Sequence, residues 1–148
     1  MVIKSPNSIT HSNSKPSIFL AGSIEMGNAE NWQEDLTKYF EKDFNIYNPR
    51  RDDWDNSWEQ SIHNPQFYEQ VSWELNALNK AQLIVMYFDP NTKSPISLLE
   101  LGLYANSKKL HVICPEGFWR KGNVDIVCEK YDIPLYSNIE NFKSRINK

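Results

Sequence analysis

The stretch that decides the fold covers residues 83–105 and reads LIVMYFDPNTKSPISLLELGLYA. Its first five residues, 83–87, are all apolar or aromatic, which is typical of a strand buried on both faces of a parallel sheet. A polar turn follows, after which Ser97 can cap a helix that carries Glu100 in its first turn. We therefore expect a central strand, a loop and a helix with one carboxylate inside an apolar run.

Glu100 is the first candidate for chemistry, because a carboxylate among leucine and isoleucine side chains is costly unless something uses it. Ligands of open α/β sheets bind beyond the carboxyl ends of the strands, where this residue would lie. A helix N-terminus also favours the ionised form that a carboxylate nucleophile needs. The alternative is an ordinary glutamate on the solvent-facing side of the helix.

The same alternation of strands and helices extends in both directions from this stretch. Strands are expected at residues 17–21, 44–47, 83–87, 110–114 and 133–136, and helices at 29–40, 65–81, 97–107, 124–131 and from 138 to the C-terminus. This rhythm predicts an α/β fold with right-handed crossovers, a flavodoxin-like three-layer sandwich with a five-stranded parallel sheet in the order 2-1-3-4-5. In that order the loop from Gly22 through Ser23 and Ile24 to Glu25 faces the loop of residues 89–100 across one crevice.

Length and composition limit the classes of protein that need to be considered. The chain has 148 residues, 40% of them hydrophobic, and a net charge of -3, which fits one domain over residues 16–148. Residues 1–15 are polar and predict a flexible tail that is neither a signal peptide nor a membrane anchor. No basic run indicates a nucleic-acid polymer, and no apolar run is long enough for a membrane span. Cys114 and Cys128 lack metal-ligand spacing and read as free thiols of a cytoplasmic protein.

A charged, tryptophan-rich loop follows the second expected strand. It begins Asn48-Pro49-Arg50-Arg51 and continues through two aspartates to Trp54. Its length and composition exceed those of a simple connector, so it is a candidate wall of a substrate site. The alternative is a surface loop whose arginines pair with its own aspartates.

Three functions are candidates for a site of this shape: phosphate binding, a flavin or receiver domain, and glycosyl chemistry. Neither of the glycine-rich phosphate-binding spacings occurs, which disfavours nucleoside triphosphates and dinucleotides. A flavin or receiver domain has the same shape, but a receiver needs clustered aspartates where this chain has Ala21-Gly22-Ser23. Paired carboxylates for glycosyl chemistry are the third option, with Glu100 as nucleophile and a second acid nearby.

Six pieces of sequence between residues 17 and 135 resemble the nucleoside 2-deoxyribosyltransferase superfamily. They read FLAGSI at 19–24, NPRR at 48–51, WEL at 73–75, SPISLLELG at 94–102, CPEGFWR at 114–120 and GNV at 122–124. The resemblance implies that Glu100 attacks C1′ of a deoxyribose and that Glu74 helps to protonate the departing base, with no cofactor or metal. Gln82 stands where the family commonly has an aspartate. The resemblance and the loops together predict the substrate contacts as Gly22, Ser23, Ile24, Asn48, Arg50, Arg51, Asp89, Ser94 and Asn123.

Two groups of the superfamily differ at the position of Ser94. Deoxyribosyltransferases often have an aspartate at this position that contacts the base, whereas related deoxynucleotide N-glycosidases have a serine that contacts the 5′-phosphate. Ser23 also matches a phosphate-contacting serine of those glycosidases, but their accompanying arginine is absent. The expected small-molecule partners are thus a deoxynucleoside or its monophosphate and a free nucleobase. A domain that binds such a ligand without turnover is the alternative from another class.

The segment after the fourth expected strand bears on assembly. Phe118 and Trp119 are large aromatics beside polar groups, a combination common at interfaces. The resemblance implies an oligomer, in which a polar residue of the neighbouring subunit reaches the 5′ end of the substrate's sugar. Asn123 matches that residue by its place in the motif. We therefore expect a homo-oligomer, a dimer or higher. The alternative is that both aromatics pack on their own domain and Asn123 caps a helix.

Overall fold

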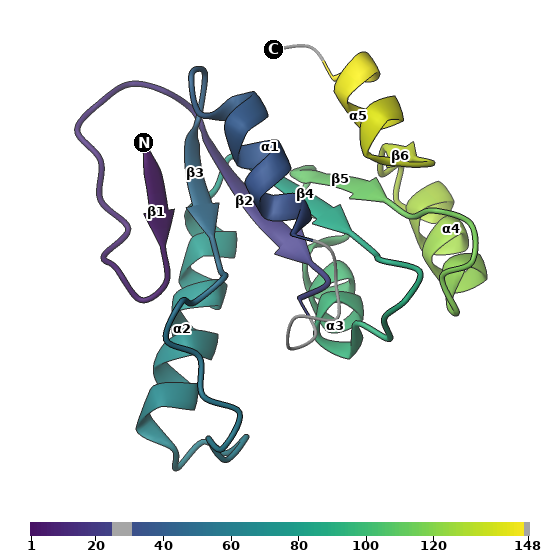
Figure 1. Ribbon diagram of the computed structural model, residues 1–148. Coiled ribbons are helices and arrows are strands. Elements are labelled where there is room, and N and C mark those ends of the chain that lie inside the picture. The colour runs from purple at the N-terminus through teal and green to yellow at the C-terminus, as the bar shows by residue number, and fades with distance from the viewer. Residues whose placement is uncertain (25–30, 147–148) are drawn as a thin grey trace. The chain divides into compact units, whose positions relative to one another are not determined.

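The computed structural model describes residues 1–24 and 31–146 (Figure 1). The elements are, in order, β1 (Val2–Lys4), β2 (Ser17–Gly22), α1 (Trp32–Phe40), β3 (Asn45–Asn48), α2 (Pro65–Lys80), β4 (Leu83–Tyr87), α3 (Pro95–Tyr104), β5 (Leu110–Ile113), α4 (Lys121–Lys130), β6 (Leu135–Tyr136) and α5 (Ile139–Arg145). The predicted alternation of strands and helices is confirmed.

The sheet has six strands in the order β1-β3-β2-β4-β5-β6, and its described pairings are parallel. The prediction of a five-stranded sheet is wrong by one strand, although the five predicted strands keep their order. The additional strand is β1, which comes from the N-terminal segment expected to be a tail. It forms because its three residues pair with β3 and the side chain of Ile3, opposite Tyr47, is only 6% exposed.

The contacts divide the chain into two compact units. The first comprises Met1–Leu20 and Trp32–Gln82, and the second comprises Ala21–Asn31 and Leu83–Lys148. The prediction of a single domain over residues 16–148 stays a prediction, and each unit is described by itself below.

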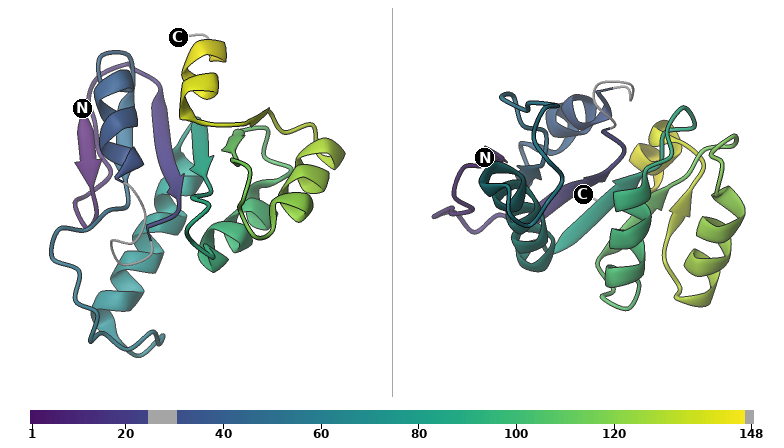
Figure 2. Two further views of the ribbon diagram at one scale, coloured as in Figure 1. Left: turned by 45° about the vertical axis from the view of Figure 1, so that its right-hand side comes forward. Right: turned by 90° about the horizontal axis from the view of Figure 1, so that it is seen from below.

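In the first unit, α1 and α2 cover opposite faces of the strands β1, β3 and β2 (Figures 1 and 2). The side chains of Trp32, Leu36 and Phe40 lie on one side of α1 and are at most 1% exposed. Helix α2 begins as predicted, with Pro65 at its first position and the Asn64 side chain accepting a hydrogen bond from the Phe67 backbone at 2.9 Å. The beginning of the helix expected at 29–40 lies outside the described residues.

In the second unit, α3 and α4 lie on one face of β4, β5 and β6, and α5 lies on the other (Figure 2). The central strand β4 is buried on both faces, because Ile84, Val85 and Met86 are all 0% exposed. This agrees with its unbroken apolar sequence. Helix α5 has the predicted Asn138 cap, which accepts from the Asn141 backbone at 2.7 Å. No helix within residues 1–24 and 31–146 is long and apolar enough to cross a membrane.

Candidate functional site

The backbone turn at Gly22 passes directly against the end of β4. Gly22 has a φ of +126°, and a Cβ atom built on it would lie 2.3 Å from the carbonyl oxygen of Tyr87. Only glycine fits at this position, both for its backbone conformation and for the space. The Ser23 backbone then donates a hydrogen bond to the same carbonyl at 2.9 Å, so the turn is fixed to the strand.

A buried cluster of hydroxyl groups joins the two loops that were expected to face each other. The Ser23 hydroxyl lies 2.5 Å from that of Ser94, and the Thr92 hydroxyl lies within 3.0 Å of both. Ser23 also accepts a hydrogen bond from the Asp89 backbone at 2.9 Å, and Thr92 donates to the Asp89 carbonyl. All four residues are at most 4% exposed. The structure therefore brings Ser23, Asp89 and Ser94 together, as the sequence predicted.

Helix α3 begins two residues earlier than predicted, because Pro95 occupies its first position, where the fixed φ of proline suits a helix. Its N-cap residue is Ser94 rather than Ser97. Ser94 has a left-handed backbone with a φ of 48° and makes no capping bond with its side chain, because its hydroxyl belongs to the cluster. Glu100 consequently lies in the second turn of the helix, not the first.

Glu100 is 7% exposed, which contradicts the alternative of a solvent-facing glutamate. In an ordinary surface helix the apolar side chains are buried and the polar ones are exposed, whereas in α3 much of this distribution is reversed. Its buried residues are Ser97, Glu100 and Leu101, whereas Ile96, Leu99 and Leu103 are 58–60% exposed. The charge of Glu100 also contributes, after burial, to raising the pKa of Tyr104 one turn away. The helix thus holds its one carboxylate on its inner side.

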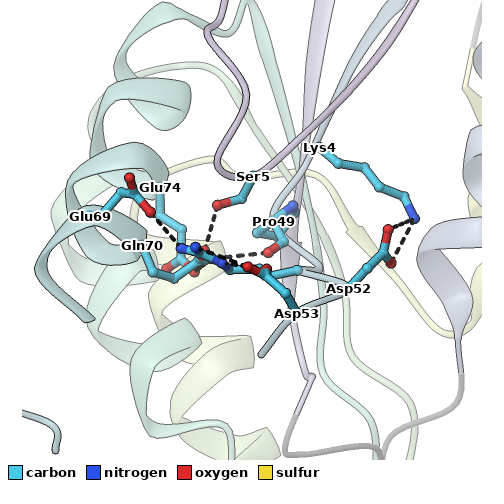
Figure 3. A network of polar contacts seen from close by, with 9 residues as sticks. Lys4, Ser5, Pro49, Asp52, Asp53, Glu69, Gln70 and Glu74 are labelled. Carbon is cyan, nitrogen blue, oxygen red and sulfur yellow. Dashed lines mark hydrogen bonds and ion pairs between the residues drawn. The ribbon is translucent and has the colours of Figure 1, made fainter. Parts of the chain in front are cut away.

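Glu74, the second predicted catalytic residue, belongs to the first unit and lies in the middle of α2. Burial raises the pKa of its carboxyl group to about 7, against the opposing effect of a hydrogen bond from Gln70. The Gln70 amide nitrogen donates to Glu74 Oε1 at 2.7 Å and to the Pro49 carbonyl at 2.9 Å (Figure 3). A carboxyl group in this state is half protonated near neutral pH, which is the property required of a general acid.

The two arginines of the tryptophan-rich loop have different surroundings. Arg51 is held by Asp53 at 2.7 Å and by Glu69 at 2.8 Å, and its guanidinium lies 5.0 Å from the centre of the Trp58 ring. These contacts match the alternative in which an arginine pairs within its own loop. Arg50 donates instead from Nε to the Gln33 side chain at 3.0 Å, and burial lowers its pKa.

The remaining predicted contacts are distributed over both units. Asn48 is 5% exposed at the end of β3 and accepts a hydrogen bond from the Arg50 backbone at 3.0 Å. Ile24 is partly buried in the second unit, next to Ser23. Glu25, which was expected in the same loop, lies outside the described residues.

The segment around α4 departs from the interface prediction for Phe118. This side chain is 3% exposed and packs against Phe88 with ring centres 4.9 Å apart, so it belongs to the core. Trp119 is 45% exposed, and the cationic groups of Lys93 and Arg120 lie 4.4 and 4.3 Å from the centre of its ring. Asn123 is exposed in the first turn of α4, whose N-cap is Arg120, so Asn123 is not the helix cap.

Sequence reasoning missed Thr92, Gln70 and Ser5. Thr92 completes the hydroxyl cluster, and Gln70 binds Glu74 while accepting a hydrogen bond from Ser5. The spacing of four residues between Gln70 and Glu74 on a predicted helix was an available signal. Over the described residues, no group of histidine, cysteine and acidic side chains is arranged to hold a metal ion.

A search of curated proteins gives no match to this chain. The family model described as nucleoside 2-deoxyribosyltransferase like matches residues 15–118, which include the hydroxyl cluster and both glutamates. The chain therefore belongs to the nucleoside 2-deoxyribosyltransferase-like family.

Proposed function

We propose that this protein is a flavodoxin-like enzyme that cleaves or exchanges the N-glycosidic bond of 2′-deoxynucleosides through a covalent glycosyl-glutamate intermediate. The observation that carries the proposal is the buried carboxylate of Glu100 on a helix whose outward side chains are apolar. Keeping a carboxylate on the inner side of such a helix is costly unless the protein uses it. Family membership supplies the substrate class.

In the proposed reaction, a Glu100 oxygen forms a bond to C1′ while the bond from C1′ to the base nitrogen breaks. The bonding electrons leave with the base, and Glu74 donates a proton to it. A nitrogen of a second base, or water, then attacks C1′ and releases the Glu100 carboxylate, while its proton passes to Glu74 and restores the acid. Two displacements at the same carbon retain its configuration. The raised pKa of Glu74 supports its assignment as acid, because its protonated form persists to about pH 7.

The serine hydroxyl cluster favours a second candidate, hydrolysis of a deoxynucleoside 5′-monophosphate. Ser23 and Ser94 match the two serines that contact phosphate in related glycosidases, and their hydroxyl oxygens are hydrogen-bonded to each other. Hydroxyl donors bind phosphate oxygens well. The other assigned contacts, namely Gly22, Ile24, Asn48, Arg50, Arg51, Asp89 and Asn123, stay predictions.

We also infer a homo-oligomer in the cytoplasm, with no nucleic-acid or membrane partner. The exposed side chains of Trp119 and Asn123 support the oligomer, since aromatic residues beside polar ones are common at interfaces. Cys114 and Cys128 are free and buried, and burial raises the pKa of each thiol to about 12. Unreactive free thiols are ordinary in a reducing compartment.

An exchange assay tests the proposal directly. The protein is incubated with each common 2′-deoxynucleoside, or its 5′-monophosphate, together with a different free base. A new nucleoside indicates a transferase, free sugar or sugar phosphate indicates a hydrolase, and no turnover indicates a binding domain.

The nucleophile is tested in the same assay by Glu100→Ala. We expect at least a thousandfold loss in rate, which corresponds to about 4 kcal/mol of barrier. Glu129→Ala, at an exposed glutamate of α4 in the same unit, is the matched control and should be as active as the parent protein. Near-normal turnover by Glu100→Ala would exclude the glycosyl-glutamate mechanism.

A further inference from the structure

The N-terminal segment lies outside the part of the chain that matches the family model, yet it is firmly attached to the first unit. Its strand β1 pairs with β3 in a register that sets Lys4 opposite Asn48. The next residue, Ser5, donates its backbone N–H to the Asn48 carbonyl at 3.2 Å. Two residues further on, the Asn7 carbonyl accepts a hydrogen bond from the Trp73 indole at 2.7 Å. The segment is thus held between β3 and α2.

This attachment brings the Ser5 side chain to Gln70. The Ser5 hydroxyl, on a residue 4% exposed, donates to Gln70 Oε1, on a residue 5% exposed (Figure 3). A carbonyl oxygen can only accept, so the donor in this contact must be Ser5. The contact therefore gives the buried Gln70 oxygen its hydrogen-bond donor.

The other end of that amide faces Glu74 and the Pro49 carbonyl, at 2.7 and 2.9 Å. If the amide turned over, its oxygen would face these two acceptors and both hydrogen bonds would be lost. These two acceptors therefore set the orientation of the amide, and Ser5 supports it by donating to the oxygen that faces the N-terminal segment. Gln70 is thus held from two sides, by Ser5 at its oxygen and by Glu74 and the Pro49 carbonyl at its nitrogen.

We propose that Ser5 is a positioning residue, which acts through Gln70 to hold the Glu74 carboxyl group in the orientation from which it donates its proton. The role of Glu74 as acid rests on the proposed function, whereas the link from Ser5 to Glu74 rests on the contacts alone. This assigns a part in the site to a segment that precedes the matched region.

The charged groups around this network are engaged with one another. Lys4 of β1 pairs with Asp52 at 3.1 Å, and Arg51 pairs with Asp53 of its own loop and with Glu69 of α2. Two influences on the pKa of Glu74 are resolved in this part of the chain. Burial raises the pKa, and the hydrogen bond from Gln70 lowers it. Loss of the Gln70 bond should therefore raise the pKa further.

The test measures the pKa of Glu74 by carbon-13 NMR of the full-length protein labelled in its glutamate carboxyl groups. The Glu74 signal is assigned by its absence in Glu74→Gln. Ser5→Ala should raise this pKa by about one unit, a tenfold change in proton affinity. Ser8→Ala removes an exposed serine hydroxyl of the same segment and should change nothing, whereas Ser5→Thr keeps the hydroxyl and should restore the parent value.

A double-mutant cycle tests the path through Gln70. Gln70→Leu should also raise the pKa of Glu74, and adding Ser5→Ala to Gln70→Leu should have no further effect. An unchanged pKa in Ser5→Ala, or equal shifts in the presence and absence of Gln70, would overturn the proposal.

The kinetic measurement distinguishes failure of this proposal from failure of the proposed function. With a poor leaving group, the alkaline limb of kcat/KM should move to higher pH in Ser5→Ala, by as much as the NMR value moves. If Ser5→Ala changed the pKa of Glu74 measured by NMR but not the alkaline limb of kcat/KM, the link from Ser5 to Glu74 would be supported and the role of Glu74 as the acid would be overturned. Absence of any turnover by the parent protein would overturn the proposed function, while the NMR result still decides the link.

Discussion

The ionisation of Glu74 should make the stability of the protein depend on pH even in the absence of substrate. Burial raises the pKa of this carboxyl group from 4.5 to about 7 in the folded protein. The folded state therefore holds the proton more tightly than the unfolded chain does. Its contribution to stability is fully present below pH 4.5 and is lost as the pH rises through 7.

The size of this contribution follows from the pKa values in the two states. Each unit of difference corresponds to 1.36 kcal/mol, so ionising Glu74 in the folded protein costs about 3 kcal/mol. This is an upper limit, since the residue retains some contact with solvent. Glu74→Gln removes the ionisation but keeps an oxygen that can accept the hydrogen bond from Gln70. The variant should match the parent protein near pH 4 and exceed its free energy of unfolding by up to about 3 kcal/mol near pH 8.

Urea denaturation at a series of pH values measures this difference, and subtracting one curve from the other cancels the titration of all other groups. Glu41→Gln is the matched control, because Glu41 is exposed in the same unit and its curve should stay parallel to that of the parent protein. If the curve of Glu74→Gln were also parallel between pH 4 and pH 8, Glu74 would not be a buried acid and its assignment as proton donor would lose its support.

Two further predictions concern packing and assembly. Gly22→Ala should destabilise the protein by about 3 kcal/mol or more in urea denaturation, because the added Cβ would meet the Tyr87 carbonyl at 2.3 Å in a strained backbone conformation. Gly102→Ala is its control, since a Cβ there meets nothing within 4 Å, and the helix preference of alanine should add about 1 kcal/mol of stability. Mixing inactive Glu100→Ala and Asn123→Ala subunits should restore part of the exchange activity if Asn123 completes a neighbour's pocket. A monomer in sedimentation, or an active Asn123→Ala protein, would contradict the shared pocket.

The sequence predicted the central part of the fold because burial of a strand on both faces leaves an unbroken apolar run. Strand β4 has the bounds that were expected, and β2 extends the expected strand by one residue. The same reasoning could not find β1, which has three residues and gains its stability from β3, more than forty residues away. The register of an edge strand depends on its partner, and no local pattern records that dependence.

The candidate site was predictable where the chemistry lies in the residues themselves. The loops that contain Ser23 and Ser94 were expected to face each other, and the hydrogen bond between these two hydroxyls shows that the loops meet. Which of two adjacent aromatics is buried was not predictable, since Phe118 and Trp119 have similar character and only the packing of Phe88 selects one. The start of α3 was misplaced because Ser97 and Ser94 are equally good caps by residue type, and Pro95 decides between them.

The surroundings of Glu74 show that residues linked by hydrogen bonds to a candidate catalytic group can lie outside the region that a family model matches. A glutamate on the middle of a helix is ordinarily solvent-exposed, and only burial together with Gln70 gives this one a pKa suited to proton transfer. Gln70 in turn accepts a hydrogen bond from Ser5, a residue before the region that the family model matches. The groups that react can be recognised from their order along the chain. The groups that orient them are recognised only when distant segments are seen in contact, so two members of one family with the same glutamates can differ in the pH at which they work.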